Sequence, residues 1–462
     1  SYGQQGLILP IEDMLGEMEN WTTMNEESPT RKADLTMSDG HVYTYGGENE
    51  CFHCMYQHRM YIYKPWVEKY LGGKNPETTE ELYNFLKMVK EDDANGNGID
   101  DEIPMTGYIG GWASDPTVWM MNSFTQCVNP LSNTNPTVAG GLVVNNGKIE
   151  YAVMKDEYRD GLRYMHKLFE EGLLDNQTFL QDNTQFSATI DASEGNKVAV
   201  YAGGGMENSE FWQGVDGEWQ NWEILAPVAG PDGVRYSGRG IQTYFEGCLG
   251  VVSSTCKYPE IVVALFDFMA SEDAVHHIGG GPEGIAWKYT DEGVSLSGGT
   301  PTYEQITVPE DFDYVKDGGL SKTYANYRYT PDAMIQGSTA EFRGNMRVAD
   351  PSHSGEYFFQ QCAELYSQYA PDVDTLVPNL SFEGEDAKIV TEGTLTIGGY
   401  VNQALVQFID GSLDIEKDWD AYIEKLKSMG VDEYVAAYQR TYDAYMDCLL
   451  YTSPSPRDTE RS

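Results

Sequence analysis

The acidic segment 92–102 carries the most specific chemical pattern in the chain. Oxygen-bearing side chains recur at every second position, and Gly98 allows a sharp turn between them. This is the alternation of an EF-hand calcium loop, in which carboxylate, amide and backbone oxygens surround one hard cation. We therefore predict a calcium site with six ligand residues: Asp93, Asn95, Asn97, Ile99 (through its backbone carbonyl), Asp101 and Glu102.

This loop departs from the motif at its end. A standard loop closes with a glutamate at its twelfth position, which is Pro104 here, so Glu102 would have to be the closing acid. Because the sequence has no second loop of this kind, we expect a structural calcium ion and not a calcium sensor. The alternative is a solvated acidic turn, in which Asn and Gly serve the conformation alone.

A cysteine pair forms the other cluster. Cys51 and Cys54 flank His53, and His58 follows shortly after. A zinc site needs four ligands, and there is no second Cys-x-x-Cys to complete one. Two semi-buried thiols or one local disulfide are the favoured interpretations, and the choice between them stays open.

Composition excludes several classes of function. The 462 residues include 73 acidic and 30 basic side chains, a formal net charge of −43, so a nucleic-acid partner or an anionic membrane surface is not expected. Apolar residues make up 40% of the chain, enough for two or three cores, yet no apolar run reaches the length of a membrane span. The nucleophile elbow, the zinc-protease motif and the phosphate loop are all missing, so we do not expect an enzyme.

Strand and helix patterns alternate along the chain, which predicts α/β layers. Thr78 and Glu81 form a capping box before an apolar stripe of Leu82, Phe85, Leu86 and Val89. A second stripe consists of Tyr158, Leu162, Met165 and Phe169, ending near Gly172. Buried strands are predicted at 198–202 and 248–252. A helix is predicted from Pro259, with four side chains facing inward: Val262, Leu265, Phe266 and Met269.

Several segments together resemble a known family. The stretch 64–72, the capped helix and the loop 93–104 follow one another as in the extracellular solute-binding proteins, family 1, of bacterial ABC importers. They are similar in particular to the lipoprotein and alginate-oligosaccharide-binding branch. Further stretches of the chain fit the same branch: 6–13, 400–404, 408–411, 418–422 and 426–430. The resemblance spans about residues 6–446.

This resemblance implies an α/β, two-lobed periplasmic-binding-protein type II fold with a hinge and an interlobe cleft. Lobe one is expected in 1–124 and 240–300, truncated at its N-terminus, and lobe two in 125–239 and 301–446. Residues 447–462 are expected to be a non-native tail. In the alginate-binding relatives the matching acidic loop holds calcium, which supports the six ligands named above.

The aromatic content favours a sugar in that cleft. The chain has nine Trp and 32 Tyr, and aromatic faces pack against the C–H face of a pyranose while amides and acids reach its hydroxyls. Trp287 ranks first, because 281–287 is similar to a family stretch that reaches the cleft. The candidates are Trp112, Trp119, Trp212, Trp287 and Tyr400. Core or hinge packing is the alternative for each of them.

The resemblance implies the substrate-binding component of a bacterial ABC importer. We expect a monomeric extracellular protein, anchored by an N-terminal lipid in its full-length form, that captures an oligosaccharide and delivers it to the transmembrane subunits of a permease. An anionic sugar would need a locally basic cleft, to which Arg235, Arg239 and Lys288 could contribute. A peptide-binding or surface-adhesive protein of the same fold and a glycoside hydrolase, which needs two carboxylates across its cleft, are the alternatives.

Overall fold

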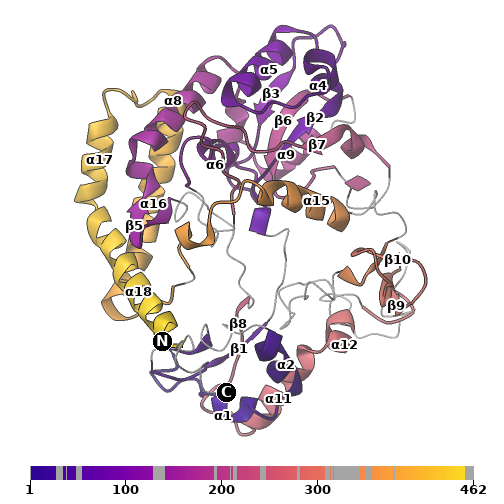
Figure 1. Ribbon diagram of the computed structural model, residues 1–462, viewed down its shortest axis with the longest axis vertical. Coiled ribbons are helices and arrows are strands. Elements are labelled where there is room, and N and C mark those ends of the chain that lie inside the picture. The colour runs from indigo at the N-terminus through magenta and orange to yellow at the C-terminus, as the bar shows by residue number, and fades with distance from the viewer. Residues whose placement is uncertain are drawn as a thin grey trace, which may run out of the picture. The chain divides into compact units, whose positions relative to one another are not determined.

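The computed structural model (Figure 1) describes most of the chain. The described residues are 2–27, 35–37, 39–47, 55–127, 141–191, 195–208, 210–211, 216–239, 246–277, 281–306, 313, 316, 344–348, 355–378 and 380–452. The cysteine pair at 51 and 54, Trp212 and the segment 453–462 lie outside them.

Two compact units make up the chain. One contains residues 1–52 and 242–357, and the other contains 53–241 and 358–462, so the chain passes between them three times. These bounds differ from the expected 1–124 with 240–300 and 125–239 with 301–446. Residues 53–124 belong with 125–239 because their strands share one sheet. Residues 301–357 belong with 242–300 because strands at 303–305 and 347–348 pair there.

The larger unit is built around a four-stranded sheet of order β3-β6-β2-β7. β3 runs parallel to β6, whereas β2 is antiparallel to both β6 and β7. Every residue of β2 and of β6 is buried, as expected for apolar strands that are covered on both faces. The strands of this unit are β2 (Arg59–Tyr63), β3 (Ile103–Thr106), β4 (Leu142–Asn145), β5 (Lys148–Tyr151), β6 (Val198–Gly203) and β7 (Trp222–Ile224).

The helices of this unit pack against that sheet and against one another. They are α4 (Lys64–Leu71), α5 (Thr79–Glu91), α6 (Pro116–Met121), α8 (Asp156–Glu170), α9 (Asn183–Ile190), α15 (Gly355–Ser367), α16 (Gly384–Asp410), α17 (Trp419–Ser428) and α18 (Val431–Thr452), with short 3-10 turns at Ala152–Met154, Asn176–Phe179, Glu218–Asn221 and Val373–Thr375. α18 continues past residue 447, where a non-native tail was expected to begin.

Local sequence signals account for α5. The Thr78 hydroxyl accepts a hydrogen bond from the Glu81 N–H at 3.1 Å, and the Glu81 carboxylate accepts one from the Glu77 N–H at 2.8 Å. The four residues of the predicted apolar stripe are fully buried, so both the cap and the inward face are confirmed. In α8 the predicted stripe is also buried, except that Phe169 is only partly buried and Leu168 takes the core position.

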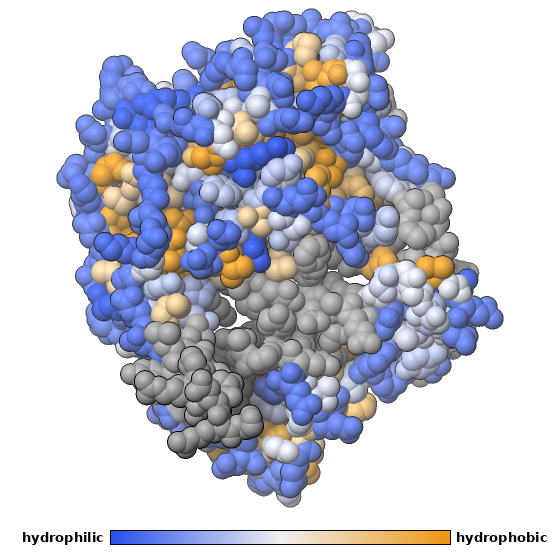
Figure 2. Space-filling view, viewed as in Figure 1, coloured by the Kyte–Doolittle hydropathy of each residue, from blue (hydrophilic) through white to orange (hydrophobic). Residues whose placement is uncertain are grey.

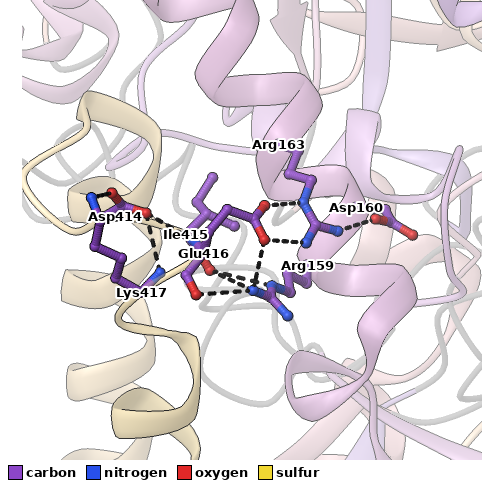
Figure 3. A network of polar contacts seen from close by, with 7 residues as sticks. All are labelled: Arg159, Asp160, Arg163, Asp414, Ile415, Glu416 and Lys417. Atoms are coloured by element: carbon purple, nitrogen blue, oxygen red, sulfur yellow. Dashed lines mark hydrogen bonds and ion pairs between the residues drawn. The ribbon is translucent and has the colours of Figure 1, made fainter.

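Polar contacts tie the C-terminal helices to α8 (Figure 3). Arg159 donates to the Ile415 carbonyl at 3.0 and 3.2 Å and to the Glu416 carboxylate at 2.9 Å. Arg163 forms a two-bond pair with the same carboxylate, at 2.5 and 2.9 Å. This hydrogen bonding holds the pKa of Glu416 below its usual value. α16 packs along α8 and α18, so the network fixes the turn that leads into α17 (Figure 1).

The smaller unit has a two-stranded sheet and short helices. β1 (Thr44–Gly47) and β8 (Glu246–Val251) pair antiparallel, and residues 7–9 hydrogen-bond to residues 252–254 directly after β8. The remaining elements are α1 (Glu12–Leu15), α2 (Glu19–Glu27), α11 (Pro259–Met269), α12 (Glu272–Val275), β9 (Trp287–Tyr289), β10 (Val294–Ser295), β11 (Tyr303–Gln305) and β12 (Arg347–Val348).

The predicted inward face of α11 is wrong at Leu265, which is 53% exposed. Val263 and Asp267 are the buried residues of this helix, and Val262, Phe266 and Met269 are partly buried. Hydrogen bonds to Asp267 account for this orientation of α11. The Asp267 carboxylate accepts from the Trp21 N–H and from the Tyr45 hydroxyl, both at 2.8 Å. Satisfying these two donors turns the helix away from the orientation that apolar spacing alone suggests.

The described surface is mostly hydrophilic on the face shown in Figure 2, in keeping with 73 acidic side chains. None of the helices among the described residues is both long and apolar enough to cross a bilayer.

The buried Tyr366 hydroxyl gives a stability test. It accepts hydrogen bonds from the Met60 N–H (3.0 Å) and the Trp119 indole (2.9 Å) and donates to the Leu225 carbonyl (2.8 Å). Tyr366→Phe leaves these groups without partners, so we expect the free energy of unfolding to fall by about 2–4 kcal/mol in chemical denaturation. Tyr400→Phe is the control, and an equal loss in both variants would contradict this account.

Candidate functional site

Parallel pairing of β3 and β6 brings two loops to one edge of the larger unit's sheet. The register pairs Thr106 with Tyr201, so the loop 107–115 after β3 and the loop 203–208 after β6 leave side by side. β2 is antiparallel, so it starts at the same edge, where Arg59 is opposite Gly203. We call these three segments, 56–59, 107–115 and 203–208, the carboxyl edge. In open α/β sheets, ligands bind outside the carboxyl ends of the strands.

Trp112 is the aromatic residue that this edge presents to solvent. Its side chain is 49% exposed, and its indole N–H donates to the Gln57 side-chain oxygen at 2.7 Å. The Trp112 carbonyl accepts from the Gly204 N–H at 3.0 Å, and the ring packs so closely that a Cβ at Gly204 would lie 2.5 Å from it. We call these three residues the Trp112 platform. It offers a fixed, half-exposed indole for the apolar face of a sugar.

The loop that carries Trp112 is held in an unusual conformation. Ala113 has φ of +51°, a region that L side chains rarely adopt, and Tyr108 N–H donates to the Ser114 carbonyl at 2.7 Å. The loop ends at Asp115, whose carboxylate caps α6 by accepting from the Thr117 N–H at 2.9 Å, ahead of Pro116 in the first turn. Strained backbone of this kind persists where surrounding contacts determine it, and it concentrates at binding sites.

Buried and partly buried polar side chains also lie on the segments of the carboxyl edge. Asn208 is fully buried, and neither its amide oxygen nor its amide nitrogen has a hydrogen-bond partner. Burial, helped by the Arg59 charge, lowers the pKa of His58 to about 4, so its imidazole is neutral. Burial raises the pKa of Glu207, whose carboxylate accepts from the Ser187 hydroxyl at 2.6 Å. Uncharged groups such as the Asn208 amide and the His58 imidazole suit hydroxyl groups.

The other predicted aromatic residues lie elsewhere. Trp119 is 4% exposed in the core of the larger unit. Trp287 is 1% exposed in the smaller unit, where its ring stacks on His276 with centroids 4.2 Å apart and its N–H donates to the Gly281 carbonyl. Tyr400 stacks on Tyr422 along α16 and is partly buried. In this structure these three have the contacts of packing residues, and Trp212 lies outside the described residues.

Sequence reasoning missed Gln57, Arg59 and Asn208, because they come from segments without a motif. The available signal was the run of glycines at 203–205 after a buried strand, where a backbone can approach an aromatic ring closely.

The three cations proposed for an anionic sugar all have protein partners. Arg235 donates to the Pro227 carbonyl and lies over the Tyr369 ring, Arg239 donates to the Pro371 carbonyl at 3.2 Å, and Lys288 pairs with Glu304 at 2.7 Å. Lys288 belongs to the smaller unit and the two arginines to the larger one.

The predicted calcium loop lies at the opposite end of β3. Its side chains already fold over its own backbone, since Asp93 accepts from the Gly98 N–H at 2.8 Å and Asn97 accepts from the Ile99 N–H at 2.7 Å. The Asn95 and Asn97 amides both donate to the Asp101 carboxylate, at 3.2 and 3.1 Å. The loop therefore gathers hard oxygen ligands around one turn, as calcium requires.

Two observations bear on the fit of a cation here. One carboxylate oxygen of Glu102 is buried without a hydrogen-bond partner, which a cation would supply. Lys197 pairs with Asp101 at 2.8 Å, and this hydrogen bond lowers the pKa of Asp101. No three His, Cys, Asp or Glu side chains among the described residues are disposed to hold a metal, so the Asn and backbone oxygens would complete the shell. The donor set fits calcium in chemistry.

Comparison with known proteins identifies proteins that are similar to this chain. No protein-family model matches the chain. It is 25% identical over 461 residues to the fructooligosaccharide ABC transporter substrate-binding protein FusA of Streptococcus pneumoniae, covering 96% of this chain and 77% of that protein. It is 22% identical to the lipoprotein LipO of Bacillus subtilis, covering 83% and 68%. The chain is a homologue of ABC-transporter solute-binding proteins.

Solved structures show the same fold. S. pneumoniae FusA in complex with kestose superimposes with a TM-score of 0.74 at 23% identity, covering 96% of this chain and 85% of that one. An extracellular solute-binding protein from Bifidobacterium longum subsp. infantis gives 0.76 at 21% identity, covering 96% and 84%. One FusA structure is of an EF-hand mutant in complex with fructo-nystose, with a TM-score of 0.73, 22% identity and coverage of 96% and 85%. The expected α/β, two-lobed fold of this homologue is confirmed.

Acid sensitivity follows from the buried histidines of this homologue. Burial lowers the pKa of both His58 and His276 to about 4, whereas an unfolded histidine titrates near 6.5. Between these values the unfolded chain binds protons that the folded chain does not, so the free energy of unfolding should fall as pH drops from about 6.5 to 4. For His58 alone the loss is about 3 kcal/mol.

The measurement is urea denaturation across that pH range. His58→Gln should remove the part of the pH dependence of the free energy of unfolding that comes from His58. The part that comes from His276 should remain. An identical pH slope in the variant would show that His58 is not a buried neutral group.

Proposed function

We propose that this chain is the substrate-binding component of a bacterial ABC importer and that it captures an oligosaccharide at the carboxyl edge. The observation that carries the proposal is the Trp112 platform, a half-exposed indole held by Gln57 and Gly204 at the carboxyl edge. Stacking on the indole would bury the apolar face of a sugar ring.

The relatives support a sugar as the ligand. FusA is a fructooligosaccharide-binding protein by name, and another structural neighbour is described as binding human milk oligosaccharides. Capture in an interlobe cleft follows from the resemblance: a ligand that contacts both lobes only when they close shifts the open–closed equilibrium, and the closed form then meets the permease. The proposal includes a monomeric, extracellular protein with a lipid anchor in the full-length form and no catalytic step.

A structural calcium ion in the loop 92–102 is the second part of the proposal. The oxygens of Asp93, Asn95, Asn97, Ile99, Asp101 and Glu102 would hold it, and the EF-hand mutant described for FusA indicates such a loop in a relative. When bound, the ion cross-links the turn that leads into β3. The loop residues themselves orient their oxygens through the Asx-type hydrogen bonds of Asp93 and Asn97.

Trp112→Ala tests the sugar site. Loss of the indole face should weaken oligosaccharide binding by about 1–3 kcal/mol, or roughly fivefold to 150-fold in Kd, because stacking area is lost. Isothermal titration with kestose, nystose and malto-, manno- and xylo-oligosaccharides measures it. Tyr258→Ala is the matched control, since Tyr258 is exposed just before α11, outside the carboxyl edge. Undiminished binding by the Trp112 variant would rule this edge out.

Calcium removal tests the metal site. Chelator-treated protein should unfold at a lower temperature than protein with calcium at a hundred times its Kd, where ligand linkage contributes about 2.7 kcal/mol. Asp93→Ala should abolish the difference, because the Asp93 carboxylate is the first of the six predicted calcium ligands. Asp100→Ala, an exposed neighbour outside that set, is the control and should retain the full calcium shift. A calcium response that survives in the Asp93 variant would contradict the assignment.

A further inference from the structure

We propose that Arg59 is the positioning residue of the Trp112 platform: its buried guanidinium holds the Gly204 turn against which the sugar-binding indole packs. The inference rests on the proposed function for its link to sugar affinity, and on geometry alone for its structural part.

Arg59 occupies an unusual position for a cation. Its side chain is fully buried at the start of β2, opposite Gly203 in the sheet register. One guanidinium nitrogen donates to the Gly204 carbonyl, and the guanidinium carbon lies 4.7 Å from the centroid of the Phe359 ring. Burying a guanidinium costs free energy, so its place in the core calls for contacts that need a planar cation.

These contacts reach the platform through one residue. Gly204 offers its carbonyl to Arg59 and its N–H to the Trp112 carbonyl, at 3.0 Å. Its Cα also lies under the indole, since an added Cβ would be 2.5 Å from the ring. Through its hydrogen bond to the Gly204 carbonyl, Arg59 therefore fixes the position and the orientation of the turn against which the Trp112 indole packs.

Arg59 also joins two points at which the chain enters the larger unit. β2 begins shortly after the chain enters at residue 53, and Phe359 follows directly after the entry at residue 358. The guanidinium contacts Phe359 on one side and Gly204 on the other. The platform is thereby anchored to both entering segments by one side chain.

The experiment compares Arg59→Met, Arg59→Lys and wild type. Trp112 is the reporter, and its contribution to acrylamide quenching is isolated by subtracting the signal of a Trp112→Phe chain. We expect Arg59→Met to unfold cooperatively, to change the quenching of Trp112, and to weaken oligosaccharide binding by about tenfold or more. Arg59→Lys should restore part of both effects, since it keeps the charge and loses the planar fork.

Gly204→Ala disturbs the packing of the Gly204 turn against the Trp112 ring without touching a buried charge. It should change Trp112 quenching and affinity in the same direction even if Arg59→Met fails to fold. Wild-type quenching and affinity in Gly204→Ala, or in a folded Arg59→Met, would overturn the inference. If the wild-type chain binds none of the oligosaccharides while the quenching still changes in both variants, the proposed sugar function fails and the positioning role stands.

Discussion

The parallel pairing of β3 with β6 is the constraint on which both proposed sites depend. At the amino ends of these strands, Lys197 before β6 pairs with Asp101 before β3, inside the predicted calcium loop. At their carboxyl ends, Gly204 after β6 supports Trp112 after β3. One strand register thus sets the predicted calcium loop at one edge of the sheet and the aromatic platform at the other. A slip by one residue would turn every side chain of either strand to the opposite face.

Buried polar residues add specificity to an otherwise apolar core. Tyr366 joins β2, α6 and Leu225, the residue after β7, through three hydrogen bonds. Asp267 orients α11 by accepting hydrogen bonds from two distant donors. Arg59 performs the same task at the carboxyl edge. Such groups tolerate few arrangements, because any rotation leaves a buried donor or acceptor unpaired. They explain why a site of exposed loops keeps a defined geometry.

Periodicity and capping predicted the elements that depend on local sequence. The capped helix α5, the stripe of α8 and the buried strand β6 were recognisable because each is specified within about a dozen residues. Leu265 on α11 was placed inward in error, since the contacts that turn this helix come from Trp21 and Tyr45, more than two hundred positions away. Sequence spacing contains no information about such distant donors.

The sequence by itself determined the α/β class, the acidic surface and the set of oxygens in the loop 92–102, because composition and short-range spacing specify all three. Only the tertiary structure decided which of the described candidate tryptophans is exposed to solvent. Trp119 and Trp287 carry the same side chain as Trp112, yet their surroundings bury them. Exposure depends on how distant segments pack around a ring. For Trp112, that packing is set where the ends of β2, β3 and β6 meet at the carboxyl edge.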